Sequence, residues 1–549
     1  MTVADTRGAV PAASLADLVR GSLMLAFDGL EVPPEMADRL RTAPAAGVTL
    51  FRFSNVDTPA QIGALTETLQ AAATRPGAAA AGPLLIAADQ EGGQLIALGE
   101  GTSQFAGSMA IGAVGDPELA ERVGRATGQE LLALGINVAY APACDLAVNP
   151  RNAAVGIRSF GDDPSAVGPL VAATVRGLQS AGVAAALKHF PGLGDVAVDT
   201  HDRLAVLGAD GPRLATRELV PFRAGIEAGA RLVMSAHLSV PALTDDPELP
   251  STLSPRIITG LLRDELGFGG VSITDALDMK ALAQGPNQVL DVLAALRAGV
   301  DLLLTAPDPG ALGRIESGLR HAAARGLLDV EGLLATAGRL AELRAWLAGF
   351  DRPDPSVVGC RAHADLADEL ARRSITLVRD DAGLLPLRLA AGARIAAIQP
   401  VPTDQTPADT SSAVAPGLAR ALRRHHGAVE EFVVAHVPDD AEIAAVRAVV
   451  SSHDVVVVGT TAAILEPGQA ALVDALIAGA TGTVVTVALR TPFDLAAYPA
   501  SRTHLSSYGI LEPTLDALAD ALFGRAPVGG RLPAAVAGLH PTGHGIDRR

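Results

Sequence analysis

The sequence predicts an α/β protein, in which a (β/α)₈ barrel is followed by a smaller three-layer α/β sandwich domain. Eight short apolar runs alternate with helix-like segments along the first two thirds of the chain. Polar residues gather where several of these runs end. Beyond a proline-rich stretch, FDRPDPSV at 350–357, a second alternation of strands and helices begins. We therefore expect a barrel over 1–349, a linker over 350–357 and a second domain over 358–549.

The barrel strands are predicted from runs that are apolar almost throughout, as parallel strands buried on both faces should be. The runs are 22–27, 48–53, 84–89, 136–142, 183–190, 231–237, 271–275 and 300–305. Eight such units close a barrel, and an open doubly wound sheet is the structural alternative.

The second domain is predicted from five further strand-like runs and two clear helices. The strands are expected at 375–379, 394–399, 454–459, 484–489 and 504–508, and the helices at 467–480 and 511–523. Between them, 403–416 (TDQTPADTSSAVAP) is typical of a long surface loop.

Composition excludes several classes of protein. With 549 residues, 49% of them hydrophobic, the chain can bury a large core. Its net charge of −17 argues against a nucleic-acid surface. Cys144 and Cys360 are too few for a disulfide framework or a zinc site and are expected to be small buried residues. No charge-free run of about 20 apolar residues predicts a membrane span, and the first residues lack a signal-peptide pattern, so we expect a cytoplasmic protein. We also expect a monomer.

Four of the predicted strands end in residues that can do chemistry. Asp89 ends the third run, Lys188 and His189 lie at the end of the fifth, His237 ends the sixth and Asp275 ends the seventh. Barrel enzymes build their active sites at the carboxyl ends of the strands. This placement favours the barrel and predicts an active site there.

Two groups are candidates for catalysis. Asp275 at a strand end can attack an anomeric carbon as a carboxylate, although an aspartate there can also cap a helix. In Asp199-Thr-His201, a carboxylate beside an imidazole fixes its tautomer and raises its basicity, which suits a general acid/base. An inert surface pair is the alternative for those two residues.

Four more residues are candidates for binding sugar hydroxyls. Lys188, His189, Asp89 and Arg158 supply the donors and acceptors that hydroxyl groups need. Structural ion pairs are the alternative for each of them.

The chain resembles glycoside hydrolase family 3, in its β-N-acetylglucosaminidase branch. The resemblance rests on the motifs DQEGG (89–93), RSFG (158–161), KHFPG (188–192), DTH (199–201) and SITD (272–275). It continues in SITLV (374–378), LLPL (384–387), VALR (487–490) and GRLP (530–533), and so extends from about residue 18 to residue 545.

The resemblance implies a retaining exo-β-N-acetylglucosaminidase that removes terminal β-linked GlcNAc, with muropeptides as the usual substrate. It implies Asp275 as nucleophile and His201, held by Asp199, as acid/base on the loop after the fifth strand. Asp89, Arg158, Lys188 and His189 match sugar-binding positions. No metal or cofactor is implied. Gln94 stands where the family usually has Arg, and Leu193 where it usually has His or Arg, which leaves the substrate beyond the first sugar open.

Several alternatives remain from the sequence alone. A family 3 β-glucosidase would take its acid/base from the second domain, where Glu466 is the candidate glutamate. A phosphorylase is a further variant, because a neutral imidazole does not repel an incoming phosphate. A metal-dependent hydrolase with His189, His201, His237 and Asp275 as ligands is disfavoured, because the first strand ends in AFDG (26–29) without a His-x-His. A non-catalytic relative is disfavoured because the catalytic set is complete.

Overall fold

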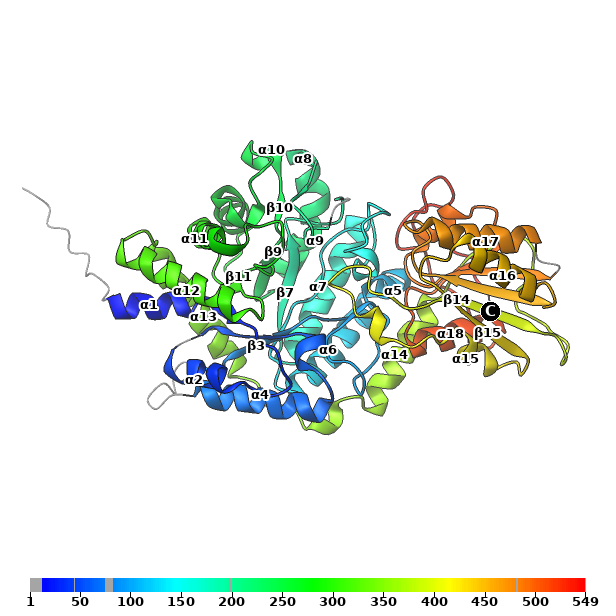
Figure 1. Cartoon of the computed structure of the whole chain (residues 1–549), viewed down its shortest axis with the longest axis horizontal. Helices are drawn as coiled ribbons and strands as arrows, with labels where there is room; N and C mark the ends of the chain where they lie inside the picture. Colours follow the sequence, from blue (N-terminus) through cyan, green and yellow to red (C-terminus); the bar gives the residue numbers. More distant parts are fainter. Residues whose placement is uncertain (1–11, 44, 75–81, 197–198, 480–481, 549) are drawn as a thin grey trace, which may run out of the picture.

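The computed structural model describes residues 12–43, 45–74, 82–196, 199–479 and 482–548, which form two units side by side (Figure 1). The first is an eight-stranded parallel α/β barrel and the second a six-stranded α/β sheet with helices on its faces. The predicted fold class is confirmed. The exact limits of the domains and of the linker at 350–357 stay a prediction.

Each of the eight predicted runs contains one barrel strand. In chain order these are β1 (Leu23–Leu25), β2 (Gly47–Leu50), β3 (Leu85–Ala88), β6 (Val138–Ala139), β7 (Ala184–Phe190), β9 (Leu232–Ser235), β11 (Val271–Thr274) and β12 (Leu303–Leu304). They pair in the order β11-β9-β7-β6-β3-β2-β1-β12, and a bridge between Ile273 and Leu302 joins the two ends of that order. The open doubly wound sheet is therefore wrong for this unit.

The barrel strands are apolar throughout because both of their faces are buried. In β3, Ile86 and Ala88 pack into the outer core with the helices, whereas Leu85 and Ala87 belong to the cluster that fills the barrel interior. Helix α13 (Val330–Leu347) adds leucines to that interior cluster.

Four of the eight principal barrel helices begin with the same local chemistry. The principal ones are α2 (Pro34–Thr42), α4 (Pro59–Ala73), α6 (Pro117–Ala133), α7 (Pro164–Ser180), α9 (Leu219–Glu227), η4 (Arg256–Glu265), α11 (Gln288–Ala298) and α12 (Pro309–Ala324). At the starts of α4, α6, α7 and α12 the preceding Thr or Asp side chain accepts a backbone N–H, and a proline occupies the first turn. These caps satisfy N–H groups that a helix start would leave unpaired.

The second unit has one strand that the sequence pattern missed. Its sheet runs β13-β18-β17-β16-β14-β15. The strands are β13 (Thr376–Asp380), β14 (Ile395–Pro400), β15 (Val429–Val434), β16 (Val455–Thr460), β17 (Thr483–Ala488) and β18 (Thr503–Ser506), and the helices are α14 (Arg361–Ser374), α15 (Leu418–Arg423), α16 (Asp440–Val450), α17 (Pro467–Gly479) and α18 (Glu512–Leu522). β15 lies at the sheet edge and reads VEEFVV, so its exposed glutamates hide the strand pattern.

The segment 403–416 is more than the surface loop that its composition predicts. It leaves β14 and packs on the barrel, where the Thr410 backbone N–H donates to the Gln94 carbonyl at 2.8 Å. The Thr410 hydroxyl accepts the Ile96 N–H at 3.1 Å and donates to the same Gln94 carbonyl at 3.1 Å. The second unit is thus hydrogen-bonded to the strand-end face of the first.

Both cysteines are unpaired, Cys144 buried and Cys360 partly exposed, so the second is less buried than expected. Across the described ranges, no helix combines the length and the apolar character that crossing a membrane requires.

Candidate active site

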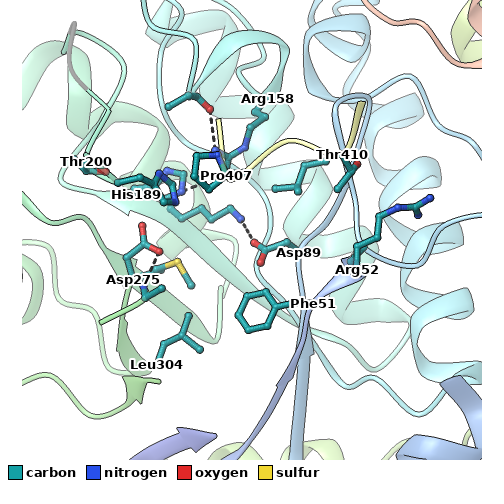
Figure 2. Close-up of a pocket in the computed structure, with 18 of the residues that line it drawn as sticks. Phe51, Arg52, Asp89, Arg158, His189, Thr200, Asp275, Leu304, Pro407 and Thr410 are labelled. Carbon is teal, nitrogen blue, oxygen red and sulfur yellow. Dashed lines mark hydrogen bonds and ion pairs between the residues drawn. The ribbon is translucent and has the colours of Figure 1, made fainter. Parts of the chain in front are cut away.

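All seven predicted site residues line one cavity at the carboxyl ends of the barrel strands, which we term the strand-end cavity (Figure 2). Its volume is about 170 Å³. Asp89 follows β3, Lys188 and His189 belong to β7, and Asp275 follows β11. The other three come from loops, Arg158 from the short turn η1 (Gly156–Arg158) and Asp199 and His201 from the segment after β7.

A cluster of four charges forms one wall of the strand-end cavity. The Lys188 ammonium lies 2.5 Å from a carboxylate oxygen of Asp89 and 2.5 Å from one of Glu91. Arg158 donates Nε–H and Nη2–H to the two Glu91 oxygens, each at 2.9 Å. Burial alone would raise the pKa of Glu91, but Arg158 and Lys188 lower it to about 2. The cluster therefore holds two cations and two anions.

Exposure separates the members of this cluster. The side chains of Lys188 and Glu91 are 1% and 2% exposed, whereas that of Asp89 is 26% exposed. Asp89 is therefore the carboxylate that a ligand in the cavity can reach. Glu91 is buried and pairs with both cations, Lys188 and Arg158. Sequence reasoning missed Glu91, although it stands inside the DQEGG motif.

His189 is oriented by a second residue that the sequence did not reveal. Its Nδ1 lies 2.6 Å from Asp145, and its Nε2 lies 3.2 Å from the Arg158 guanidinium. Asp145 also accepts the Leu193 backbone N–H at 2.6 Å. Because the Asp145 carboxylate accepts the Nδ1 proton, Nε2 can accept from Arg158. The departure at Leu193 leaves this backbone contact intact.

Asp275 is partly exposed at the end of β11, and its surroundings lower its pKa. Burial raises the pKa of Asp275. His189, His237 and His201 lower it, and so does the Ala276 N–H, which donates to the carboxylate at 2.8 Å. Together these groups bring the pKa of Asp275 below its ordinary value. The residues that follow form turns, and the next α-helix, α11, begins only at Gln288. The helix-cap interpretation of Asp275 is therefore wrong, and the carboxylate is free to act in the cavity.

The Asp199–His201 pair has the geometry of an oriented acid/base. One Asp199 oxygen lies 2.7 Å from His201 Nδ1 and accepts the His201 backbone N–H at 2.9 Å. Burial lowers the pKa of His201, but the Asp199 hydrogen bond and the charges of Asp275 and Asp199 outweigh it, and the pKa is raised. The His201 carbonyl also accepts the Lys280 N–H at 3.2 Å, which ties this segment to the turns after Asp275.

His237 belongs to the metal-dependent alternative that the sequence disfavours. His237 is buried, with Nδ1 2.8 Å from the Thr252 hydroxyl and Nε2 3.2 Å from the Ala276 carbonyl. Both of its nitrogens are engaged, and burial lowers its pKa. Within the described part of the chain, no group of three or more His, Cys, Asp or Glu is placed to hold a metal ion.

The second domain contributes Pro407, Ala408 and Thr410 to the cavity lining. Glu466 does not line the cavity and instead acts electrostatically on His436. Gln94 is 2% exposed, and its side chain accepts the Ile157 N–H at 3.2 Å. Gln94 therefore stabilises the turn that carries Arg158.

The chain is similar to known glycosidases over most of its length. Residues 22–342 match the family described as glycosyl hydrolase family 3 N terminal domain, and residues 375–539 match glycosyl hydrolase family 3 C-terminal domain. Beta-hexosaminidase A of Pseudoalteromonas piscicida is 36% identical over 380 residues, which cover 65% of this chain and 63% of that protein. The chain thus spans less than two thirds of that relative's length. A beta-hexosaminidase of Stenotrophomonas maltophilia (strain K279a) is 38% identical over 330 residues, 57% of this chain and 95% of that protein.

Solved structures of family 3 glycosidases are also similar to this chain. The structure of a glycoside hydrolase family 3 beta-N-acetylglucosaminidase from Paenibacillus sp. str. FPU-7 matches with a TM-score of 0.88 and 34% identity, over 95% of this chain and 99% of that one. A fungal multi-domain beta-N-acetylglucosaminidase matches with a TM-score of 0.88 and 31% identity, over 96% of this chain and 61% of that one.

Proposed function

Because this chain belongs to glycosyl hydrolase family 3, we propose that it is a retaining exo-β-N-acetylglucosaminidase that releases terminal β-linked GlcNAc. The observation that carries the proposal is the meeting of Asp275 and the Asp199–His201 pair in one strand-end cavity. The names of the relatives, beta-hexosaminidase and beta-N-acetylglucosaminidase, support the choice of sugar.

In the first step, the Asp275 carboxylate attacks C1 of the sugar. Protonated His201 donates its Nε2 proton to the glycosidic oxygen as the C1–O bond breaks, and the leaving group departs as an alcohol. The products of this step are a glycosyl ester on Asp275 and a neutral His201. Asp199 stabilises the protonated imidazole before the transfer and keeps Nδ1 as the donor to itself.

In the second step, neutral His201 takes a proton from water as the water oxygen attacks C1. The ester bond to Asp275 breaks, which restores the carboxylate and the protonated imidazole. Two displacements at C1 retain the β configuration. A lowered pKa favours the carboxylate form of Asp275 and a raised pKa favours the protonated form of His201, which are the starting forms of this two-step mechanism.

The sugar is held by Asp89, Lys188, Arg158 and His189, which surround the cavity. Their charges are balanced with the help of Glu91, so a neutral sugar can enter without leaving an unpaired buried ion. The β-glucosidase alternative receives no support from Glu466, which lies outside the cavity lining. Muropeptide turnover, a cytoplasmic location and a monomeric state are further parts of this proposal that rest on the sequence.

The test compares leaving groups in wild type, His201→Ala and Asp275→Ala. His201→Ala should lower kcat/KM by roughly 10²–10⁴-fold on chitobiose, whose leaving group needs a proton, and much less on nitrophenyl β-N-acetylglucosaminide. Asp275→Ala should abolish turnover of both. His321→Ala, at an exposed histidine of α12, is the matched control. Equal losses of His201→Ala on both substrates, or faster wild-type turnover of nitrophenyl β-glucoside, would contradict the proposal.

A further inference from the structure

Part of the wall of the strand-end cavity comes from the second domain, in the segment 403–416, which we term the bridging segment. Pro407, Ala408 and Thr410 line the cavity, and Figure 2 shows Pro407 and Thr410 among the side chains that surround it. The proposed nucleophile and acid/base belong to the barrel. The cavity therefore has its full wall only while the bridging segment is held against the barrel.

The bridging segment lies over the carboxyl ends of the parallel strands of the second domain. It follows β14, which ends at Pro400, and the Gln405 side chain donates to the Thr461 carbonyl, just after β16, at 3.2 Å. The Gln399 side chain of β14 accepts the Leu418 N–H, just past the end of the segment, at 2.7 Å. Both ends of the bridging segment are thus tied to β14.

This end of the sheet contains a topological switch point. β14 pairs with β15 on one side and with β16 on the other, so the chain crosses β14 on its way from β15 to β16. In doubly wound sheets, ligands bind in the crevice outside the carboxyl ends of the strands at such a point. In this chain the bridging segment itself lies across these strand ends.

A buried ion pair fixes the middle of the bridging segment to the sheet. Arg490 follows β17, and its Nη1 lies 2.8 Å from the Asp409 carboxylate. The two side chains are 3% and 0% exposed. Asp409 also accepts the backbone N–H groups of Gln405 at 3.2 Å and Ser411 at 2.9 Å. One carboxylate therefore shapes the turn of the segment and anchors it.

Arg490 depends on the bridging segment for its counter-charge. In the described part of the chain, Asp409 is the only carboxylate within ion-pair distance of it. Its other acceptor among the described residues is the Ser411 hydroxyl at 3.5 Å, in the same segment, and its Nη2 has none there. Asp494 acts on Arg490 only from farther away, and one of its oxygens accepts the Thr460 hydroxyl at 2.7 Å. Without the Asp409 charge, Arg490 would be a buried cation without compensation.

Adjacent residues of the bridging segment connect the two domains. Asp409 binds Arg490 in the second domain, whereas Thr410 hydrogen-bonds to the backbone of the barrel. Pro407 and Ala408, which line the cavity, directly precede this pair of residues in the chain. Their position against the cavity therefore depends on the anchor at Asp409.

We propose that Asp409 and Arg490 are positioning residues, whose buried ion pair holds the bridging segment against the strand-end cavity and thereby sets the affinity for the terminal sugar. The inference rests on the proposed glycosidase function and adds two residues of the second domain to it. Neither is among the described residues that line the cavity, so both act through the wall and not on the reacting atoms. Loss of the pair should weaken sugar binding and leave the chemical step nearly unchanged.

The kinetic test uses Asp409→Asn, Arg490→Met and the double variant. Each single change should raise KM for nitrophenyl β-N-acetylglucosaminide and the inhibition constant of free GlcNAc by about tenfold, as for the loss of a charge-assisted hydrogen bond, with kcat within about threefold of wild type. The double variant should be no worse than either single one, because the same pair is lost only once.

A matched control separates positioning from a general loss of stability. Leu476→Ala opens a cavity in a buried core cluster of the second domain, to which no described residue of the bridging segment belongs. This variant is destabilised, but its KM and its inhibition constant for GlcNAc should equal those of wild type. An equal rise in both constants in Leu476→Ala would contradict the specific role of the ion pair.

Hydrogen exchange measures the anchoring directly and needs no substrate. In wild type the N–H groups of Gln405, Thr410 and Ser411 are hydrogen-bonded. Peptides that cover 403–416 should exchange about tenfold faster in Asp409→Asn and at the wild-type rate in Leu476→Ala. Saturating GlcNAc should slow exchange of the same peptides in wild type, which provides a test even if the ion-pair variants do not fold.

Three results would overturn the positioning role. They are unchanged binding constants in folded Asp409→Asn, additive effects in the double variant, and exchange of 403–416 that responds neither to Asp409→Asn nor to GlcNAc. Failure of wild type to cleave nitrophenyl β-N-acetylglucosaminide would instead overturn the proposed function. The exchange rates of the ligand-free proteins would still test the ion pair in that case.

Discussion

Replacing Lys188 with methionine should lower the free energy of unfolding by up to about 3 kcal/mol at pH 7. The change keeps the length of the side chain and removes a buried ammonium that lies 2.5 Å from both Asp89 and Glu91. Breaking a buried ion pair by removing one partner costs roughly 3–5 kcal/mol, because the remaining charge is left without compensation.

The structure places this loss at or below the lower end of that range, because Glu91 keeps Arg158 as a partner. The fall in the pKa of Glu91 from its ordinary value of 4.5 to about 2 corresponds to roughly 3 kcal/mol. Arg158 shares that stabilisation and stays bound to Glu91 in the variant. Asp89 loses its partner as well, but its side chain is 26% exposed and can be rehydrated.

The pH dependence has a defined sign. Since Glu91 has a lower pKa in the folded protein than in the unfolded chain, its stabilisation is fully present above about pH 4.5 and is lost as the pH falls towards 2. The difference between wild type and Lys188→Met should therefore shrink over that interval.

Urea unfolding followed by tryptophan fluorescence measures these values, because Trp346 on α13 is the single tryptophan and lies in the barrel. Lys280→Met is the matched control. Its ammonium is 70% exposed and lies 3.7 Å from Asp202, so its loss should change stability by well under 1 kcal/mol. Equal stabilities of the two variants would refute the argument.

Two further predictions concern the catalytic groups. Asp199→Asn removes the negative charge that raises the pKa of His201 and leaves a weaker, uncharged acceptor for Nδ1. The loss of kcat/KM on chitobiose at high pH should therefore begin at a lower pH than in wild type. Asp202→Asn, next to the pair and exposed, should leave the profile in place, and an unshifted profile in Asp199→Asn would show that His201 is not the titrating acid. Glu466→Gln should keep kcat/KM on nitrophenyl β-N-acetylglucosaminide within about twofold, whereas a loss of 100-fold or more would move the acid/base to the second domain.

The barrel could be predicted from sequence because parallel strands buried on both faces are continuous apolar runs. The site followed from the same signal, since Asp89, His189 and Asp275 stand where such runs end. Periodicity fails where a strand is half exposed, as in β15, whose two adjacent glutamates are both exposed at the sheet edge.

The residues that sequence reasoning missed share one property: they act through partners far away in the chain. Glu91 and Asp145 became visible only as the acceptors of Arg158, Lys188 and His189. Thr410 accepts a hydrogen bond from Ile96, which lies 314 residues away in the sequence. A pattern of neighbouring residues cannot reveal such a contact.

The two lysines of this chain have opposite surroundings. Lys188 and Lys280 are the only ones in the sequence, and the first is sealed in the charge cluster while the second is in water. An amine-directed reagent would thus modify a single lysine side chain, in the residue whose backbone N–H bonds to the His201 carbonyl. A fluorophore attached to Lys280 would report changes in the surroundings of the acid/base segment during turnover, and no cysteine would have to be engineered for the labelling.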